Sequence, residues 1–185
     1  VEEQTPLYDL TSAGKIRMPD DDTTADLFQR TGDYLAEQGY PRYEISNYAR
    51  SGYECRHNLH YWQIEPYLGF GPSAHGFDGN RRWWNVKNLN QYLTRVESGS
   101  PAVHDTELLT PVELINERIG FGLRIAEGFN LNNIPVKYRY QVENKIEFCN
   151  SKWSGCLTYK GNRLALTSKG LLFADAIAVD MQFGA

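Results

Sequence analysis

The chain has 185 residues, of which 41% are hydrophobic, 13% aromatic and 23% charged, and its formal net charge is −4. This composition is typical of one folded domain or of two small ones, and it excludes the low hydrophobicity and high net charge of disordered chains. The negative total also argues against binding by attraction of the whole surface to nucleic acid or anionic lipid.

The chain carries no signal for export or membrane insertion. No stretch approaches the roughly 20 apolar residues that a bilayer span needs. The first four residues, Val-Glu-Glu-Gln, have neither the basic nor the apolar region of a secretory signal. We therefore expect a cytoplasmic protein, and because the chain begins without methionine we also expect that a preceding segment has been removed.

Three cysteines, Cys55, Cys149 and Cys156, are odd in number and unevenly spaced. This pattern fits neither the disulfide framework of a secreted protein nor a paired CxxC metal site. We therefore expect reduced thiols and no metal site in this chain.

The first predicted element is a helix that begins at residues 20–22, three aspartates that suit the positive end of a helix dipole. Gly39 and Pro41 should end this helix. Its apolar face would consist of Leu27, Phe28, Tyr34 and Leu35.

Residues 43–48, with the sequence YEISNY, alternate with period two and predict one strand. Alternate side chains of a strand point to opposite faces, and we expect the polar set to point into a barrel. That set is Glu44, Ser46 and Tyr48. If buried, Glu44 could act as a proton donor, although a hydrogen-bonded structural carboxylate is the more common case.

Residues 67–77 (YLGFGPSAHGF) predict a short apolar strand that runs into a glycine-rich turn. A short helix should follow and end before Gly99 and Pro101. Its apolar face would consist of Leu89, Tyr92, Leu93 and Val96. The next residues, 98–105, are the expected domain boundary.

We therefore predict a first domain of residues 1–100 and a second domain of residues 106–185. In the second domain, Thr110 and Glu113 form a capping box with proline at the first helical position, which predicts a helix. Residues 130–148 predict one or two further helices.

The end of the chain predicts a hairpin and a last helix. The expected break in residues 130–148 falls near Pro135. Residues 157–166 predict a β-hairpin in which two short strands are joined by a Lys-Gly-Asn turn. Thr167 or Ser168 should cap a helix that continues through Met181. Helices followed by a hairpin and another helix resemble a small winged-helix module.

The densest polar and aromatic cluster is residues 53–62. Imidazole can ligate haem iron or carry protons near neutral pH, and flat aromatic rings offer an apolar surface for a macrocycle. The alternative is that the polar residues cap a loop while the aromatic rings fill the gap between a sheet and its helix. Spacing alone favours this structural interpretation.

The glycine-rich loop, residues 69–76, is the second candidate, because glycines let the backbone approach a ligand and free N–H groups can face a carboxylate or phosphate. The alternative is that these glycines satisfy a corner or a bulge in a sheet. Arg81 and Arg82 could pair with carboxylates of a ligand, although surface salt bridges are the more common role.

Several motifs together resemble the HemW family, relatives of oxygen-independent coproporphyrinogen III oxidase in the radical S-adenosylmethionine superfamily. The residues that carry the resemblance are YEISNYA (43–49), GYEC (52–55), HNxxYW (57–62) and YLGFGPSAHG (67–76). The PDDD segment before the first helix and RRWWN after the glycine-rich loop add to it. The likeness covers nearly the whole chain.

The resemblance implies an α/β fold: the final part of a partial (β/α)6 TIM-like radical SAM barrel, followed by a small helical, winged-helix-like carboxy-terminal domain with a β-hairpin. It also implies a [4Fe-4S] cluster and S-adenosylmethionine in the full-length parent, held by a CxxxCxxC loop. No CxxxCxxC occurs here, and three scattered cysteines cannot replace it. We expect no cluster in this chain and no catalytic activity from it alone.

The resemblance also implies roles for particular residues. The haem or substrate contacts would be His57, Asn58, Tyr61 and Trp62. The residues beside S-adenosylmethionine would be Ser73, Ala74 and His75. No residue of the chain is expected to be catalytic.

Three functions follow as expectations. The first is a haem-binding chaperone that delivers haem to a haem-accepting protein, for which a membrane enzyme is one candidate. The second is a true coproporphyrinogen III oxidase, but HNxxYW and the carboxy-terminal module favour the chaperone. The third is a nucleic-acid-binding or protein-binding winged module, suggested by seven basic and two acidic side chains within residues 131–170. Because the total charge is negative, we expect no nucleic-acid partner.

Overall fold

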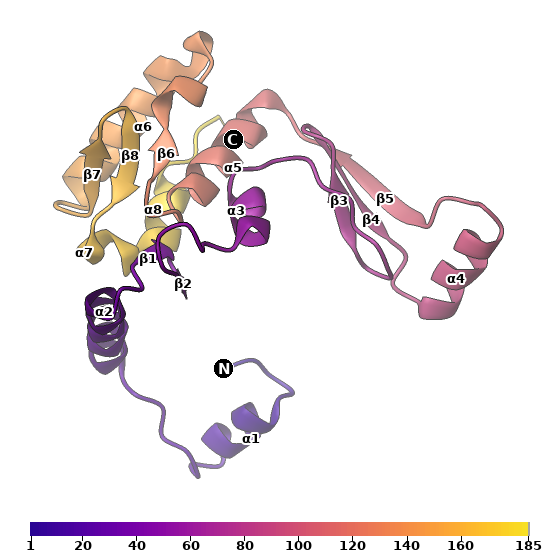
Figure 1. Ribbon diagram of the computed structural model, residues 1–185, viewed down its shortest axis with the longest axis horizontal. Helices are drawn as coiled ribbons and strands as arrows, with labels where there is room; N and C mark the ends of the chain where they lie inside the picture. Colours follow the sequence, from indigo (N-terminus) through magenta and orange to yellow (C-terminus); the bar gives the residue numbers. More distant parts are fainter. Residues whose placement is uncertain (185) are drawn as a thin grey trace.

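The computed structural model describes residues 1–184 as helices joined to three small antiparallel sheets (Figure 1). The elements of the first half are α1 (Pro6–Ser12), α2 (Asp21–Glu37), β1 (Arg42–Glu44), β2 (Asn47–Tyr48), α3 (Arg56–Trp62), β3 (His75–Phe77), β4 (Arg81–Asn85) and α4 (Leu89–Glu97). Those of the second half are β5 (Val103–Leu108), α5 (Pro111–Gly122), β6 (Phe129–Asn130), η1 (Leu131–Asn133), η2 (Val136–Tyr138), α6 (Arg139–Lys152), β7 (Leu157–Lys160), β8 (Arg163–Leu166), α7 (Ser168–Leu171) and α8 (Ala174–Asp180).

The sheets pair β1 with β2, β3 with β4 and β5, and β6 with β8 and β7. All of these pairs are antiparallel. The expectation of helices combined with sheets is confirmed. A parallel barrel wall would need strands from outside residues 1–184, so the barrel stays a prediction.

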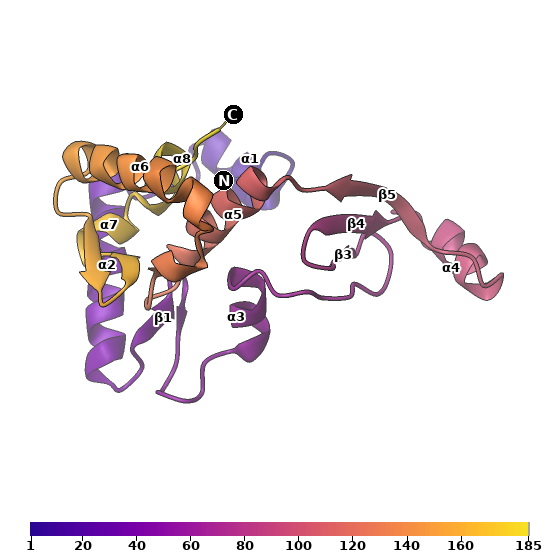
Figure 2. The same cartoon turned by 90° about the horizontal axis from the view of Figure 1, so that it is seen from above.

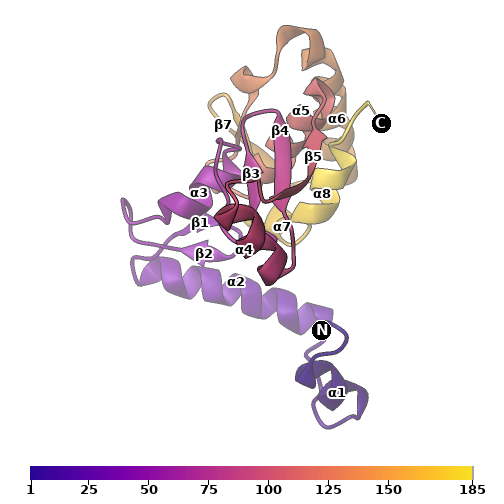
Figure 3. The same ribbon diagram turned by 90° about the vertical axis from the view of Figure 1, so that its right-hand side faces the viewer.

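Helix α2 begins where the sequence predicts, because the side chain of Asp20 accepts a hydrogen bond from the Thr23 N–H at 2.8 Å. It ends before Gly39, whose φ of +83° suits glycine. Figure 3 shows α2 running alongside β1 and β2, with α1 beyond its start. Leu27 and Tyr34 on its apolar face remain exposed, so only part of that face is covered.

The prediction of a single strand at residues 43–48 is wrong. The chain instead forms two strands, β1 and β2, that reverse direction between Glu44 and Asn47. The Glu44 carboxylate accepts hydrogen bonds from the Ser46 N–H at 2.7 Å and from Asn47 Nδ2 at 2.6 Å, which stabilises the turn. Glu44 is buried, whereas Ser46 lies exposed at the turn. The two side chains therefore do not point to one face, in contrast to the single-strand prediction.

The strand predicted to precede the glycine-rich turn is also displaced. Tyr67 and Phe77 exchange two backbone hydrogen bonds as an isolated bridge, and the regular strand β3 follows the loop. Gly71 and Ser73 have φ of +104° and +60°, values that interrupt an extended strand. The loop therefore projects between its two bridged ends.

Strands β3, β4 and β5 form an arm that extends from the rest of the molecule and ends in α4 (Figures 1 and 2). Helix α4 confirms the prediction for residues 89–96, and Ser98 and Gly99 end it. Strands β4 and β5 were not predicted from the sequence. Because β5 pairs with β4 from Val103 to Leu108, it crosses the expected boundary at 98–105, and the division into two domains stays a prediction.

The second half begins with the predicted capping box. Thr110 N–H donates to the Glu113 carboxylate at 2.7 Å, and Glu113 N–H donates to Thr110 Oγ1 at 3.3 Å, so α5 starts at Pro111. The predicted break near Pro135 is confirmed, because η1 ends before it and η2 follows it. The hairpin of β7 and β8 is confirmed too.

The last predicted helix is divided in two. Thr167 caps α7 by accepting from the Gly170 N–H at 3.1 Å, as expected. Phe173 then leaves the helical path, with φ −120° and ψ 18°, and its ring lies 5.3 Å from that of Trp153. Aromatic stacking therefore accompanies the break before α8.

The core of the molecule lies in the second half, between α5, α6, α8 and the sheet of β6, β8 and β7. Its buried members are Ile115, Ile119, Leu123, Phe129, Ile134, Val142, Ile146, Cys149, Cys156, Leu164, Leu166, Ala174, Ile177, Met181 and Phe183. No comparable cluster of buried apolar residues forms in the arm within residues 1–184. The stability of the chain therefore depends mainly on the second half.

All three cysteines are free thiols, as predicted, and burial raises the pKa of Cys149. Among residues 1–184 no helix is long and apolar enough to cross a bilayer. No group of three or more metal-ligating side chains gathers in the described part of the chain either.

A pH-dependent contact joins α6 to α8. Lys152 Nζ lies 2.7 Å from Asp180 Oδ2, and Trp153 Nε1 donates to the same oxygen at 2.7 Å. Their hydrogen bonds, that of Lys152 first, lower the pKa of Asp180. A carboxyl group whose pKa is lowered by folding stabilises the fold above its unfolded pKa, and this contribution is lost as pH falls through the folded pKa.

We expect Asp180→Asn to be less stable than the wild type at pH 7, and we expect the difference to shrink below about pH 4 and to vanish once the pH falls below the lowered pKa of the folded carboxyl. Urea unfolding at several pH values measures this difference. Asp175→Asn is the matched control, because the side chain of Asp175 in the same helix is 94% exposed. A stability difference for Asp180→Asn that stays constant with pH would contradict the assignment.

Candidate functional site

Helix α3 brings His57 and Tyr61 together on one face. They stand one helical turn apart, with ring centroids 4.9 Å apart in an edge-to-face arrangement. Tyr61 continues this contact to Tyr67, whose ring centroid lies 4.6 Å away. His57 is exposed and Tyr61 is half-buried. The predicted pair therefore forms an accessible aromatic surface with an imidazole at its edge.

Asn58 and Trp62 lie on the adjacent face of α3, also one turn apart. The Trp62 ring lies 5.7 Å from the Phe121 ring, and the Arg124 guanidinium lies 4.8 Å above the indole. Trp62 therefore packs α3 against α5, whereas the structural interpretation of the sequence placed such rings between a sheet and its helix. Its Nε1 is buried and has no acceptor among residues 1–184.

The second imidazole of the motif has a different role. His60 Nε2 lies 2.8 Å from the Pro66 carbonyl oxygen, and Nδ1 lies 2.8 Å from the Glu65 carboxylate. Both ring nitrogens therefore hold the loop after α3. His57 is the imidazole that remains available to a ligand.

A cavity of about 280 Å³ lies beside Trp62, where α3, α5 and β6 meet. Its lining consists of Trp62, Gln63, Glu65, Arg118, Gly122, Ile125, Glu127, Gly128, Phe129, Asn130, Asn133 and Arg163. The cavity adjoins the α3 cluster at Trp62, whereas His57, Asn58 and Tyr61 do not line it. The sequence did not indicate this cavity, since its walls come from distant segments.

The loop of Ser73, Ala74 and His75 lies on the arm and away from this cavity. Asn85 Nδ2 donates to the Gly71 carbonyl at 3.0 Å, and the Gly71 N–H donates to Tyr92 Oη at 3.0 Å. The Cβ of any larger residue at Gly69 would lie 2.0 Å from the His75 carbonyl oxygen. The loop is therefore held tightly, with the Ser73 and His75 side chains exposed.

Arg82 is engaged inside the protein. It lies 2.8 Å from the Glu117 carboxylate and 3.7 Å from that of Glu107, an ion pair that joins the arm to α5. Burial alone would lower the pKa of Arg82, but the hydrogen bond and charge of Glu117 outweigh it and raise the pKa. The neighbouring Arg81 pairs with Asp78 at 3.1 Å. Arg82 is thus held by two carboxylates, whereas Arg81, whose side chain is 57% exposed, forms only a surface ion pair.

Tyr67 was not among the predicted site residues, although it completes the aromatic row. Burial raises the pKa of its hydroxyl, so the group stays protonated near neutral pH. Its bridge to Phe77 connects the α3 cluster to the glycine-rich loop. The sequence of residues 67–77 gave no signal of the bridge between Tyr67 and Phe77, which forms because the glycine-rich loop brings its two ends together.

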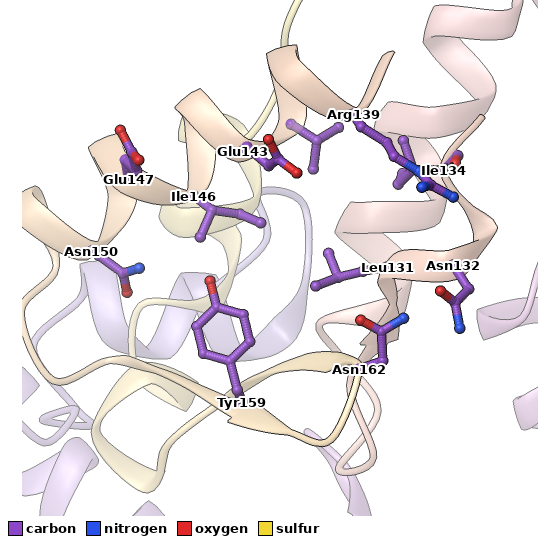
Figure 4. A pocket seen from close by; sticks show the side chains of 11 residues that line it. Leu131, Asn132, Ile134, Arg139, Glu143, Ile146, Glu147, Asn150, Tyr159 and Asn162 are labelled. Atoms are coloured by element: carbon purple, nitrogen blue, oxygen red, sulfur yellow. Dashed lines mark hydrogen bonds between the residues drawn. The ribbon is translucent and has the colours of Figure 1, made fainter. Parts of the chain in front are cut away.

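A larger cavity, about 430 Å³, lies elsewhere, between α6 and the β7–β8 hairpin (Figure 4). Figure 4 shows Leu131 and Ile146 in the middle of the pocket, Glu143 on α6, and Tyr159 pointing its hydroxyl from the hairpin toward α6. None of the predicted site residues lines it. Its lining carries two carboxylates, Glu143 and Glu147, against one guanidinium, Arg139, so it is a poor match for an acidic ligand.

The basic residues of the second half are mostly bound within the fold. Lys152 pairs with Asp180 at 2.7 Å, and Arg163 pairs with Glu127 at 3.2 Å. Lys160 and Lys169 donate to the backbone carbonyls of Ala126 and Ser154. Of the seven basic side chains in residues 131–170, two are therefore paired with carboxylates and two further lysines are held by backbone carbonyls.

Comparison with known proteins gives clear relatives. The chain is 36% identical over 177 residues to "Heme chaperone HemW" of Mycobacterium tuberculosis, which covers 96% of this chain and 44% of that protein. It is 36% identical over 139 residues to the protein of the same name in Bacillus subtilis, covering 75% of this chain and 36% of that protein. The chain thus spans less than half the length of the curated relatives it matches.

More distant similarity extends to other proteins. The mitochondrial "Radical S-adenosyl methionine domain-containing protein 1" of Danio rerio is 31% identical over 136 residues, which is 69% of this chain and 31% of that protein. Coproporphyrinogen III oxidase from Escherichia coli, described as a radical SAM enzyme, has a similar structure with a TM-score of 0.67 and 19% identity, covering 89% of this chain and 42% of that one. No protein-family model matches the chain.

Proposed function

The chain is a homologue of the HemW proteins over most of its length, and from this premise we propose that it is the carboxy-terminal portion of a radical SAM haem chaperone, which binds haem and delivers it to haem proteins. The observation that carries the proposal is the exposed His57 beside Tyr61 on α3. An imidazole can ligate haem iron, and an aromatic face can lie against the macrocycle. The partner is then a haem-accepting protein, and we place the chaperone in the cytoplasm.

The same premise suggests the fold around the site. We propose that residues 1–100 complete a partial (β/α)6 barrel with strands from outside this chain. We further propose that residues 106–185 form a winged-helix-like domain. The order of α5, β6, α6 and the β7–β8 hairpin, with β6, β8 and β7 in one antiparallel sheet, supports the second part.

We also propose that the whole protein uses a [4Fe-4S] cluster and S-adenosylmethionine. The three cysteines of this chain do not fit a cluster site, because Cys149 and Cys156 are buried in the second half while Cys55 lies exposed before α3. The glycine-rich loop fits a role beside S-adenosylmethionine better. Its exposed Ser73 hydroxyl and His75 imidazole can bind polar groups, and the Asn85 contact keeps the loop in place.

Haem titration into the full-length protein tests the haem site. We expect His57→Ala and Tyr61→Ala each to weaken haem binding roughly tenfold or more, equivalent to at least about 1.4 kcal/mol, and His57→Ala to shift the Soret band. His104→Ala is the matched control, because this imidazole is also exposed but lies on β5.

An unchanged Soret band and affinity in both α3 variants would contradict the haem site on α3. Trp62 is unsuitable for this test, because its packing on Phe121 and Arg124 would confuse loss of binding with loss of structure. Product analysis with coproporphyrinogen III under anaerobic, reducing conditions addresses the activity. Formation of protoporphyrinogen IX would overturn the chaperone in favour of the oxidase.

A further inference from the structure

The cavity beside Trp62 contains one positive charge without a partner. Glu65 is paired with His60 at 2.8 Å, and Glu127 is paired with Arg163 at 3.2 Å. Arg118, from α5, lines the same cavity, and no carboxylate of residues 1–184 lies within salt-bridge distance of it. The unpaired charge in this cavity is therefore that of the Arg118 guanidinium, which is half-buried.

The wall of this cavity also carries a residue with an unsatisfied hydrogen-bond donor, Trp62. Trp62 Nε1 and Arg124 Nε are both buried without an acceptor, and the Arg124 guanidinium lies 4.8 Å above the Trp62 ring. Of these two residues only Trp62 lines the cavity, and a ligand that supplies an acceptor atom to its indole N–H would be favoured, because a buried donor without a partner is costly. A half-buried guanidinium that has no carboxylate partner among residues 1–184 is suited to a carboxylate ligand.

We propose that Arg118 binds a carboxylate of the haem, one of its propionates, in the cavity beside Trp62. The inference rests on the proposed haem-binding function and names the group that would recognise the acidic edge of the ligand. The remainder of the macrocycle would lie toward Tyr61 and His57 on the open side of α3. A cavity of about 280 Å³ accepts one edge of a tetrapyrrole and leaves the rest exposed, which suits a carrier that must release its cargo.

Other cationic sites fit a propionate less well. Arg82 is already paired with Glu117 and Glu107, and Arg163 with Glu127. The larger cavity carries Arg139 at its wall, but that guanidinium donates to the Ile134 carbonyl at 3.4 Å and shares the lining with Glu143 and Glu147. Arg118 is therefore the guanidinium that combines a cavity, a free charge and proximity to the α3 motif.

The test compares haem with haem dimethyl ester, which keeps the iron and the ring but has no carboxylates, in the full-length protein. The wild type should bind haem roughly tenfold more tightly than the ester, the size expected from one charge-assisted hydrogen-bonded pair. Arg118→Gln should lose most of this preference by weakening haem binding while the affinity for the ester changes less than about twofold. Arg118→Lys should restore part of the preference, since it retains the charge without the planar fork.

Arg139→Gln is the matched control and should keep the wild-type preference for haem. An Arg118→Gln protein that weakens haem and ester equally would show only a structural role and overturn the proposal, as would one that changes neither. If Arg118→Gln keeps the wild-type preference for haem over the ester while His57→Ala and Tyr61→Ala weaken haem binding, the haem site stands and the Arg118 assignment alone fails. If wild type binds neither ligand, the proposed function itself fails.

Discussion

Replacing Ile177 with alanine should lower the free energy of unfolding by about 3 kcal/mol. Ile177 is fully buried in the middle of α8, within the core that α5 and α6 share. Shortening its side chain removes apolar contacts and leaves a cavity that the surrounding helices can fill only in part. Urea unfolding followed by tryptophan fluorescence measures the change, because Trp153 lies against this core.

Val179→Ala is the matched control for Ile177→Ala. Val179 lies in the same helix but is 64% exposed. Its replacement should change the free energy of unfolding by no more than about 0.5 kcal/mol. Equal losses from the two variants would mean that α8 does not pack as described, and that the core lies elsewhere.

Gly128→Ala should destabilise the chain by about 3 kcal/mol or more, for two separate reasons. Gly128 has φ +81°, which an L side chain adopts only with strain. In addition, an added Cβ would lie 2.3 Å from the Leu164 carbonyl oxygen and 2.7 Å from Ala165 Cβ. Both neighbours are buried in the central strand β8, so neither can move away at low cost.

Gly155→Ala separates the two reasons. Gly155 also has a positive φ, +77°, but an added Cβ there would meet no atom within 4 Å. Its replacement should therefore cost only the backbone strain, about 1 kcal/mol. Thermal unfolding of both variants measures the difference. A Gly155→Ala protein as unstable as Gly128→Ala would contradict the close approach of β8 to Gly128.

The sequence alone determined the elements whose signals are local. Caps such as Asp20, Thr110 and Thr167 depend on side chains within three residues of the helix start, so they could be recognised without any tertiary contact. The same holds for the break at Pro135 and for the hairpin around Gly161. The motif of the candidate site, residues 57–62, was recognisable by its resemblance to the HemW family, whereas the helix that carries it, α3, was not predicted.

Tertiary structure decided the features that depend on distant partners. Residues 42–48 form a hairpin because the Glu44 carboxylate bonds to two donors after it, and alternation of residue types does not reveal such a turn. Strand β5 of the arm is open to solvent along most of its length, so burial imposed no alternating pattern on it and it could not be predicted.

The candidate site divides in the same way. The sequence indicated the α3 aromatic residues, but the engagement of Arg82 with Glu117 and the free charge of Arg118 depend on how α5 lies against α3 and the arm. A guanidinium is available to a ligand only if folding brings no carboxylate to it. That condition depends on three-dimensional distances between segments far apart in the chain, and only the folded structure supplies them.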